Sequence, residues 1–384
     1  MLQCQAVRRS QYKLAPSRFV SLSSKVHSLG RALITNLVPY HRRSSHRFTM
    51  QALRFEKTGS FDELALHTIA KPSLAPGEAL VRVKAAGVNG SDAAAILGIL
   101  PFVTLPRTPG RDFSGEVVEA LDNSGTPAKA WIGTDVWGTG SERGFTSDGT
   151  FAEFVKVPLA ALSRKPKTLS HVDAASMTLP WLCAWITVDT LAKVKQGDNV
   201  VIIGARGGIG SAAAQLCKDR GARLFGTYTS LANATPPPYL TPIALTSDTA
   251  IRDAIAKEDL SNKIDVLLDC AGYERPFNDA LFTMTPNGSG RVVVMAVHSK
   301  DDLFPINMRT FYTKALTIKG MKSSILSSIE IKAFLDLLSE KIDSGVFQGP
   351  QAVVTVDIKD TLAVAGALKE ILTRSSHVRS VFVT

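Results

Sequence analysis

The sequence predicts an α/β protein of two domains, in which a β-rich domain precedes a domain built on a doubly wound parallel sheet. The chain has 384 residues, and one domain usually takes about 100 to 200. From Met50 to residue 173, short alternating runs are separated by Gly, Pro, Asp and Ser clusters, which is typical of antiparallel strands. From residue 174 onward, fully apolar strands alternate with helical runs, which indicates a parallel sheet buried on both faces.

The first 49 residues differ from the rest in composition. They hold nine Lys and Arg residues, eight Ser residues and no Asp or Glu, whereas the remaining charges nearly cancel although the whole chain carries +10. This composition is typical of a mitochondrial transit peptide. The sequence therefore predicts a mitochondrial protein with residues 1–49 removed and no nucleic-acid partner, because the folded part has no excess charge. The alternative is a disordered basic extension, with Met50 as the true start.

The cysteines and the apolar runs argue against a disulfide-stabilised protein and against a membrane-spanning protein. The four Cys residues show no C-x-x-C spacing, so a disulfide scaffold is not expected. The apolar stretch 174–194 is interrupted by Pro180, Asp189 and Lys193, so we expect a buried helix and no transmembrane span.

Strands and helices are expected to alternate through the second domain. The runs NVVIIGA, RLFGTY, IDVLLDCAG and GRVVVMAV read as strands, and a helix near residues 329–342 precedes a final strand, helix and strand. Between residues 230 and 246, four prolines exclude a continuous helix, so we expect an irregular crossover there.

A glycine-rich turn carries the clearest chemical signal. The strand 200–204 leads directly into a turn and then a helix, and a turn in this position lets the backbone approach a pyrophosphate at the helix N-terminus. Gly207 would permit the approach and Gly210 the close packing of helix on strand. The residues predicted to bind the dinucleotide here are Ala205, Arg206, Gly207, Gly208, Ile209 and Gly210.

The tip of the next strand predicts which dinucleotide binds. NAD-binding domains usually place a carboxylate there for the ribose 2′-hydroxyl, but this chain has Tyr228, Thr229 and Ser230. Hydroxyl groups without an acid favour NADPH, and the alternative is that they are ordinary loop residues. Arg206 either reaches a phosphate or points to solvent.

These motifs, in order, resemble the zinc-free quinone oxidoreductase branch of the medium-chain dehydrogenase/reductase superfamily. The resemblance covers Met50 to Thr384 and rests on AAGVNGSD, PGRDFSGEVVEA, DVWGTG, DGTFAEFVKVP, AASMTLPWLCAW, VVIIGARGGIGSAAAQL, VLLDCAG and GRVVVMAV. It implies a GroES-like catalytic domain over 50–173, a Rossmann nucleotide-binding domain over 174–322 and a return to the catalytic domain over 323–384. It also implies cofactor contacts from Cys270, Ala271 and Gly272.

The resemblance further implies that the chain binds no metal. Asn89 and the pair Arg111-Asp112 stand where zinc-dependent relatives place their ligands, and the scattered Cys and His residues do not form a tetrahedral set. The edge strand Ala315–Met321 implies a homodimer, because an open apolar edge favours pairing across a two-fold axis.

Asn89 is the catalytic candidate. By the resemblance it faces the nicotinamide and the reacting carbonyl, where its amide would bind a developing enolate or the cofactor; alternatively it stabilises a turn. Asp92 is expected to cap the following helix. The tyrosine common in the family is replaced by Ala94 or Ala95, which leaves the proton donor unassigned.

Three residues on the apolar helix are expected to serve packing. Trp181 and Trp185 are four residues apart and share one helical face, which favours core packing over a stacking surface for a flat acceptor. Cys183 has no His or charged neighbour in sequence and reads as a small buried hydrophobe.

We therefore expect a zinc-independent NADPH-dependent oxidoreductase that transfers a hydride to a quinone or an α,β-unsaturated carbonyl. The alternatives are a mitochondrial trans-2-enoyl thioester reductase and a non-catalytic NADPH-binding assembly protein. The acceptor pocket is expected to depend on the loops 97–108 and 141–147, which carry no motif.

Overall fold

The computed structural model describes residues 48–140, 142–232, 234–298, 303–350, 352–373 and 378–384. The prediction of a transit peptide falls almost wholly on residues 1–47, outside the described residues, and stays a prediction.

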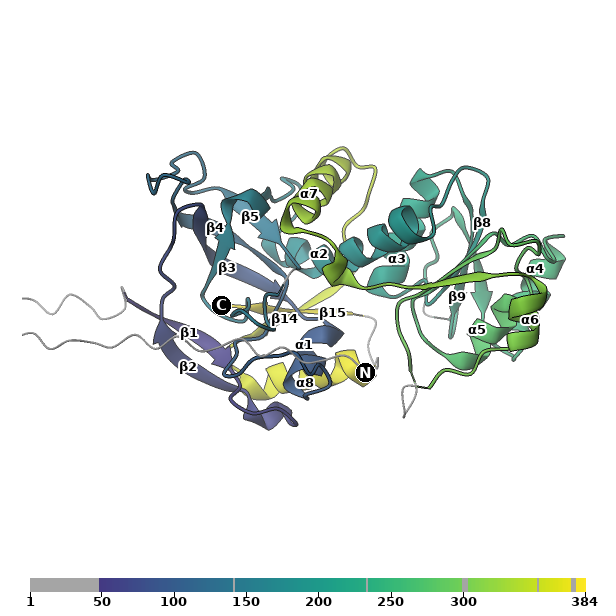
Figure 1. Cartoon of the computed structure of the whole chain (residues 1–384), viewed down its shortest axis with the longest axis horizontal. Coiled ribbons are helices and arrows are strands. Elements are labelled where there is room, and N and C mark those ends of the chain that lie inside the picture. Colours follow the sequence, from purple (N-terminus) through teal and green to yellow (C-terminus); the bar gives the residue numbers. More distant parts are fainter. Residues whose placement is uncertain (1–47, 141, 233, 299–302, 351, 374–377) are drawn as a thin grey trace, which may run out of the picture. The chain divides into compact units, whose positions relative to one another are not determined.

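The first sheet combines strands from both ends of the chain. It has seven strands, in the order β14-β15-β3-β4-β5-β7 with β6 also pairing with β3, and all pairs are antiparallel except β14 with β15. Figure 1 shows β14 and β15 in yellow beside β3. The strands are β3 (Glu78–Gly87), β4 (Phe113–Ala120), β5 (Asp135–Gly138), β6 (Phe154–Pro158), β7 (Ser163–Arg164), β14 (Val353–Asp357) and β15 (Arg379–Val383).

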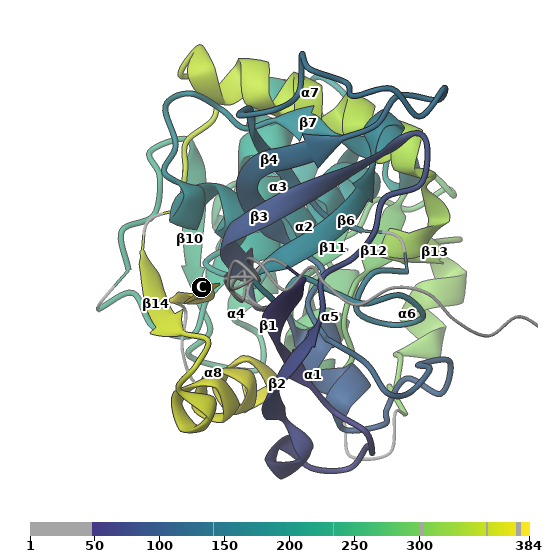
Figure 2. The same ribbon diagram turned by 90° about the vertical axis from the view of Figure 1, so that its left-hand side faces the viewer.

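A short hairpin and two helices complete this region. β1 (Thr49–Arg54) pairs antiparallel with β2 (Ala65–Ala70). α8 (Thr361–Thr373) joins β14 to β15 and packs against α1 (Gly90–Ile96). Figure 2 shows both helices at the end of the view that also holds the β1-β2 hairpin. Because Val364, Leu368 and Phe382 share one core with Val83 and Phe113, the C-terminal segment is part of the β-rich fold.

The second sheet is fully parallel and has six strands in the order β10-β9-β8-β11-β12-β13. Its strands are β8 (Asn199–Ile203), β9 (Arg223–Tyr228), β10 (Leu240–Ala244), β11 (Val266–Asp269), β12 (Arg291–Val294) and β13 (Thr317–Gly320). The connecting helices are α3 (Gly208–Asp219), α4 (Ala250–Lys257), α5 (Glu274–Leu281) and α6 (Met308–Thr313). The predicted α/β fold, a β-rich GroES-like part and a Rossmann-type parallel sheet, is confirmed.

The crossover from β9 to β10 contains no helix among its described residues, as the prolines predict. The chain instead runs irregularly from residue 229 to 239, with position 233 not described. The loop is therefore free to line a pocket beside the tip of β9 instead of covering the sheet.

The apolar run 174–194 forms α2 (His171–Trp185) and a π-helical turn, Ile186–Leu191. α2 contacts both β3 and α3, so it links the two sheets. The predicted core role of its tryptophans is confirmed, because the Trp181 and Trp185 rings each lie 4.9 Å from a phenylalanine, Phe347 and Phe334 respectively. No helix within the described residues is long and apolar enough to cross a membrane.

α7 (Ser328–Asp343) follows the second sheet and supplies Phe334 to this core. It begins with a capping box, in which the Ser327 hydroxyl accepts the Glu330 N–H and the Glu330 carboxylate accepts the Ser327 N–H. The remaining short helical turns are 3₁₀ segments at Phe61–Glu63, Leu159–Ala161 and Ser323–Ile325.

Candidate cofactor and acceptor site

The carboxyl ends of four parallel strands meet at one edge of the second sheet. In the strand register, Asp269 pairs with both Ile203 and Val294, and Val294 pairs with Gly320. The sheet order places β8 and β11 side by side, although β9 and β10 lie between them in sequence. Ligands of open α/β sheets bind at this kind of switch point, outside the carboxyl ends of the strands.

The glycine-rich turn occupies this edge, formed by the carboxyl ends of β8, β11, β12 and β13, which we call the nucleotide edge. Gly204 has a φ of +82°, and its N–H donates to the Thr227 hydroxyl at 3.0 Å, which ties the end of β8 to β9. A Cβ on Gly210 would lie 2.2 Å from the Gly204 carbonyl oxygen, so only glycine lets α3 start this close to the strand. Gly207 is the N-cap and has no side chain, so the first N–H groups of α3 are left to a ligand.

A pocket of about 360 Å³ adjoins the turn. From the predicted cofactor residues it includes Ala205, Arg206, Gly208 and Tyr228, together with Tyr239 and Arg379, which the sequence did not indicate. Burial raises the pKa of both tyrosines, so their hydroxyls remain hydrogen-bond donors at neutral pH. Thr229 and Ser230 are exposed at the end of β9.

Cys270, Ala271 and Gly272 follow β11 at the same edge. The Ala271 and Gly272 N–H groups both donate to the Asp269 carboxylate, at 3.0 and 2.8 Å. A Cβ on Gly204 would lie 3.1 Å from the Ala271 Cβ. The structure thus brings this segment beside the glycine-rich turn.

Arg379 links the turn to the β-rich sheet. Its Nη2 donates to the Asn89 side-chain oxygen at 3.0 Å, and its Cδ lies 3.4 Å from where a Gly208 Cβ would be. Its Nε is buried and has no hydrogen-bond partner among the described residues. Burial lowers the pKa of this partly buried arginine, and the charge of Asp112 opposes that effect. A cofactor phosphate or ribose oxygen would satisfy the free N–H.

Asn89 is 5% exposed, and both ends of its amide have partners. Its Nδ2 donates to Asp112 at 2.9 Å, while its oxygen accepts from Arg379. The Thr139 hydroxyl and the Leu179 N–H also donate to the Asp112 carboxylate. Burial raises the pKa of Asp112, and the hydrogen bonds from Thr139 and Asn89 oppose that rise. In this arrangement Asn89 orients Arg379 and Asp112, while the second N–H of its Nδ2 is used by neither of these bonds.

Asp92 lies in the first turn of α1, and its carboxylate accepts the Asn89 backbone N–H at 2.9 Å. The predicted role at the start of the helix is therefore observed. Burial, and then the charge of Asp112, raises the pKa of Asp92 to about 7. Because of that shift, the Asp92 carboxyl holds a proton up to about pH 7. The neighbours of Asp92 in sequence did not indicate this.

Two buried arginines stand beside this pair of carboxylates. Arg111 is 3% exposed, and its Nη1 donates to the Ser323 hydroxyl at 3.1 Å. Arg143 is also buried, and its pKa falls to about 10 because of burial and then the charge of Arg111. Amide and guanidinium groups, which Asn89 and Arg111 carry, do not ligate zinc. Burial raises the pKa of the Cys183 thiol to about 12. The residues at this position therefore do not fit a zinc ion.

No group of three or more potential ligands of the Cys, His, Asp and Glu type occurs within the described parts of the chain. The site described above instead gathers the guanidinium groups of Arg111, Arg143 and Arg379 around two carboxylates, Asp92 and Asp112.

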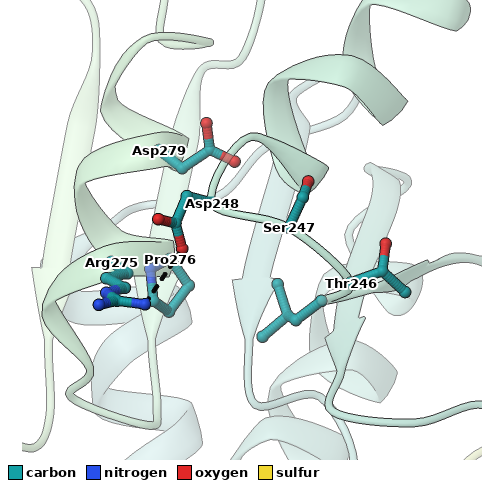
Figure 3. Close-up of a pocket in the computed structure, with 7 residues that line it drawn as sticks. Thr246, Ser247, Asp248, Arg275, Pro276 and Asp279 are labelled. Atoms are coloured by element: carbon teal, nitrogen blue, oxygen red, sulfur yellow. Dashed lines mark hydrogen bonds and ion pairs between the residues drawn. The ribbon is translucent and has the colours of Figure 1, made fainter.

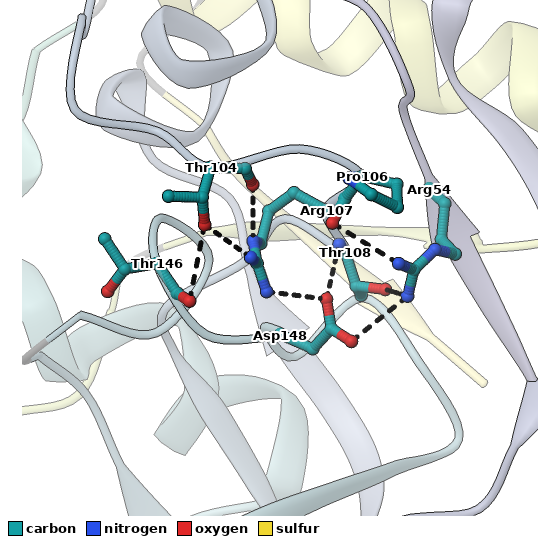
Figure 4. Close-up of polar contacts among 7 residues, drawn as sticks. All are labelled: Arg54, Thr104, Pro106, Arg107, Thr108, Thr146 and Asp148. Carbon is teal, nitrogen blue, oxygen red and sulfur yellow. Dashed lines mark hydrogen bonds and ion pairs between the residues drawn. The ribbon is translucent and has the colours of Figure 1, made fainter. Parts of the chain in front are cut away.

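The Asp148 carboxylate holds in place the loops 97–108 and 141–147, in which the sequence shows no motif. The Asp148 carboxylate lies between the Arg54 and Arg107 guanidinium groups, at 3.1 and 3.0 Å, and also accepts the Thr108 N–H at 3.0 Å (Figure 4). Phe102 meets Phe145 edge to face, with ring centroids 5.5 Å apart. Since the Arg111 guanidinium carbon lies 5.0 Å from the Phe145 ring centre, these loops extend to the arginine cluster.

A second pocket of about 250 Å³ lies between the end of β10 and α5 (Figure 3). Its ion pair between Asp248 and Arg275 is exposed and 3.4 Å long. Asp279 is buried but accepts the Ile251 N–H and the Arg252 guanidinium, so its charge is used to fix α4. This pocket holds no free buried polar group within the described chain.

A glycine-rich turn beside a buried polar cluster is the arrangement expected of a dinucleotide-dependent oxidoreductase, and comparison with known families agrees. Residues 75–167 match the family described as Alcohol dehydrogenase GroES-like domain. Residues 208–340 match the family described as Zinc-binding dehydrogenase. The chain belongs to the medium-chain dehydrogenase/reductase superfamily, whose cofactor is NAD(P).

The relatives include reductases. A "Zinc-type alcohol dehydrogenase-like protein C337.11" from Schizosaccharomyces pombe is 31% identical over 78% of this chain and 87% of its own length. The "Quinone oxidoreductase" of Mus musculus is 26% identical over 77% and 87% of the two chains. The "2-methylene-furan-3-one reductase" of Solanum lycopersicum is 29% identical over 59% and 57%. The crystal structure of AibC superposes with a TM-score of 0.73 at 25% identity, over 90% of this chain and 99% of that one.

Proposed function

We propose that the protein is a zinc-independent NADPH-dependent reductase whose acceptor is a quinone or an α,β-unsaturated carbonyl. The observation that carries the proposal is the chemistry of the cluster beside the nucleotide edge, where Asn89, Arg111 and Arg379 provide donors and Asp112 and Asp92 are their partners. A conjugated acceptor is already polarised, so it can accept a hydride without a Lewis acid when hydrogen-bond donors stabilise the oxygen. The names of the mouse and tomato relatives agree with this acceptor class.

The cofactor preference rests on the charge around the tip of β9. Among the described residues that line the pocket there is no carboxylate, whereas Arg206, Tyr228 and Tyr239 are present. These groups suit a 2′-phosphate, which carries close to two negative charges. When bound, NADPH would supply the hydride. The first turn of α3 would hold its diphosphate, and the Nε of Arg379, which has no partner among the described residues, lies at the same pocket.

We further propose that the protein acts as a homodimer in mitochondria. Support for the dimer comes from β13, whose residues are all exposed at the sheet edge, with Ile318 39% exposed. Support for the location comes only from the composition of residues 1–49.

The test is NADPH oxidation with a panel of quinones, conjugated enones and enoyl thioesters, with and without a chelator. We expect turnover with quinones or enones, no effect of the chelator and lower activity with NADH. Preference for thioesters would instead support the enoyl reductase alternative. Tight NADPH binding without turnover on any acceptor would support the non-catalytic one.

A further inference from the structure

Arg111 has more hydrogen-bonding capacity than the fold uses. Its side chain is 3% exposed, and only Nη1 has a partner, the Ser323 hydroxyl. Nε and Nη2 are buried and have no hydrogen-bond partner among the described residues. A buried charged donor without a partner is destabilising, so the binding of an oxygen ligand at these two groups would be favourable.

The local charge also favours an anionic oxygen. Arg111, Arg143 and Arg379 bring three positive charges, whereas the acids of the cluster are Asp92 and Asp112. Burial raises the pKa of Asp92 to about 7, and Asp112 accepts hydrogen bonds from three donors. The cluster therefore carries a net positive charge in a buried region, where the low dielectric strengthens its attraction for an anion.

The guanidinium lies at the nucleotide edge of the second sheet. Its partner Ser323 follows the carboxyl end of β13 by three residues, at the edge that also holds the glycine-rich turn. The Phe145 ring lies against the guanidinium and limits its movement. Its two free N–H groups are thus held in a fixed plane, as bidentate recognition of an oxygen requires.

We propose that Arg111 is a catalytic residue that binds the carbonyl oxygen of the acceptor through Nε and Nη2; this rests on the proposed function. When the hydride pair forms the new C–H bond, the C=C pair shifts and the C=O pair moves onto oxygen, giving an enolate or phenolate, while the reduced nicotinamide is oxidised. The guanidinium stabilises that oxyanion but does not protonate it. The proton that completes the product comes from water.

The test uses 4-nitrophenol, an oxyanion mimic whose visible absorbance reports its ionisation, added to the NADPH-loaded protein. We expect the bound phenol to be more ionised than the free phenol at pH 6. Arg111→Gln should weaken its binding about 10- to 100-fold and leave the bound fraction largely neutral. Arg164→Gln is the control, since Arg164 is exposed and stacks on Trp131, and it should match wild type.

Equal affinity and ionisation in wild type and Arg111→Gln would overturn the assignment, as would a wild-type spectrum that shows only neutral bound phenol. If Arg111→Gln does not fold, Arg111→Lys decides: it keeps the charge without the planar fork, and unchanged phenolate binding would refute the role of Nε and Nη2. Turnover is a separate result. Phenolate binding that depends on Arg111 in a protein without reductase activity would remove the proposed function but keep the oxyanion site.

Discussion

Two buried carboxylates, Asp92 and Asp112, give the β-rich part an unusual response to pH. The pKa of Asp92 rises to about 7 in the folded state from the ordinary 3.8, chiefly because of burial. Between these two values the folded protein holds a proton that the unfolded chain has lost. The free energy of unfolding therefore falls as pH rises from about 4 to 7, and levels off above that range.

Asp92→Asn should remove much of this pH dependence. We expect wild type to lose about 2–3 kcal/mol more than the variant between pH 5 and 7, because each unit crossed corresponds to about 1.4 kcal/mol. Urea unfolding at pH 5, 6, 7 and 8 measures it. Exposed acids with lowered pKa values, such as Asp122 and Glu330, are present in both proteins. Their contributions to the pH dependence of the free energy of unfolding therefore cancel in the comparison. Parallel curves for the two proteins would contradict the burial of an uncharged Asp92.

A single residue at the tip of β9 tests where the 2′-phosphate binds. Ser230→Asp would place a carboxylate several ångströms from that phosphate, which at an effective dielectric of about 20 costs on the order of 2–4 kcal/mol. NADPH binding should weaken roughly 30- to 1000-fold. NADH, which has no such phosphate, should lose little, so the preference should shrink or reverse.

The matched control is Ser261→Asp, an exposed serine before the start of β11 and hence at the opposite edge of the same sheet. It adds the same charge and should leave both affinities unchanged. Fluorescence titration with each cofactor gives the result. Equal weakening of NADPH and NADH by Ser230→Asp would show that the 2′-phosphate lies elsewhere.

At the scale of elements, β13 is one of the two edge strands of the parallel sheet. The N–H groups of Thr317 and Met321 donate toward β12, to Gly290 and Val294. Because N–H directions alternate along a strand, the Ile318 N–H points toward the free edge. It is therefore available to a second copy of the chain and is not needed for the sheet itself.

Ile318→Pro should convert a dimer into a monomer, since proline removes that outward N–H without removing a bond to β12. Ile318→Thr keeps the N–H and should remain dimeric. Light scattering at micromolar concentration distinguishes the two. A wild-type monomer, or an Ile318→Pro dimer as stable as wild type, would refute association through this strand.

At the scale of the whole molecule, local patterns predicted the fold and the glycine-rich turn that begins α3. The turn from residue 205 to 210, the parallel strands and the irregular crossover each depend on neighbours in sequence, so composition and spacing indicated them. The bond between Asn89 and Arg379 joins positions 290 residues apart, and that between Arg111 and Ser323 joins positions 212 apart. The first contact forms because β15 pairs with β3, and the second because Ser323 follows the end of β13. Neither contact can be predicted from residues that are neighbours in sequence.

The N-terminal prediction can be tested by two deletions that differ by seven residues. Removing residues 1–47 leaves β1 intact, so the free energy of unfolding should change by less than about 0.5 kcal/mol. Removing residues 1–54 also removes β1, its pairing with β2 and the buried side chains of Met50 and Leu53, which should cost about 3 kcal/mol or more. Denaturant unfolding of both forms checks the boundary, and N-terminal sequencing of protein from mitochondria checks import. A mature form that begins at Met1, or a loss of stability in the shorter deletion, would show that residues 1–47 belong to the working protein.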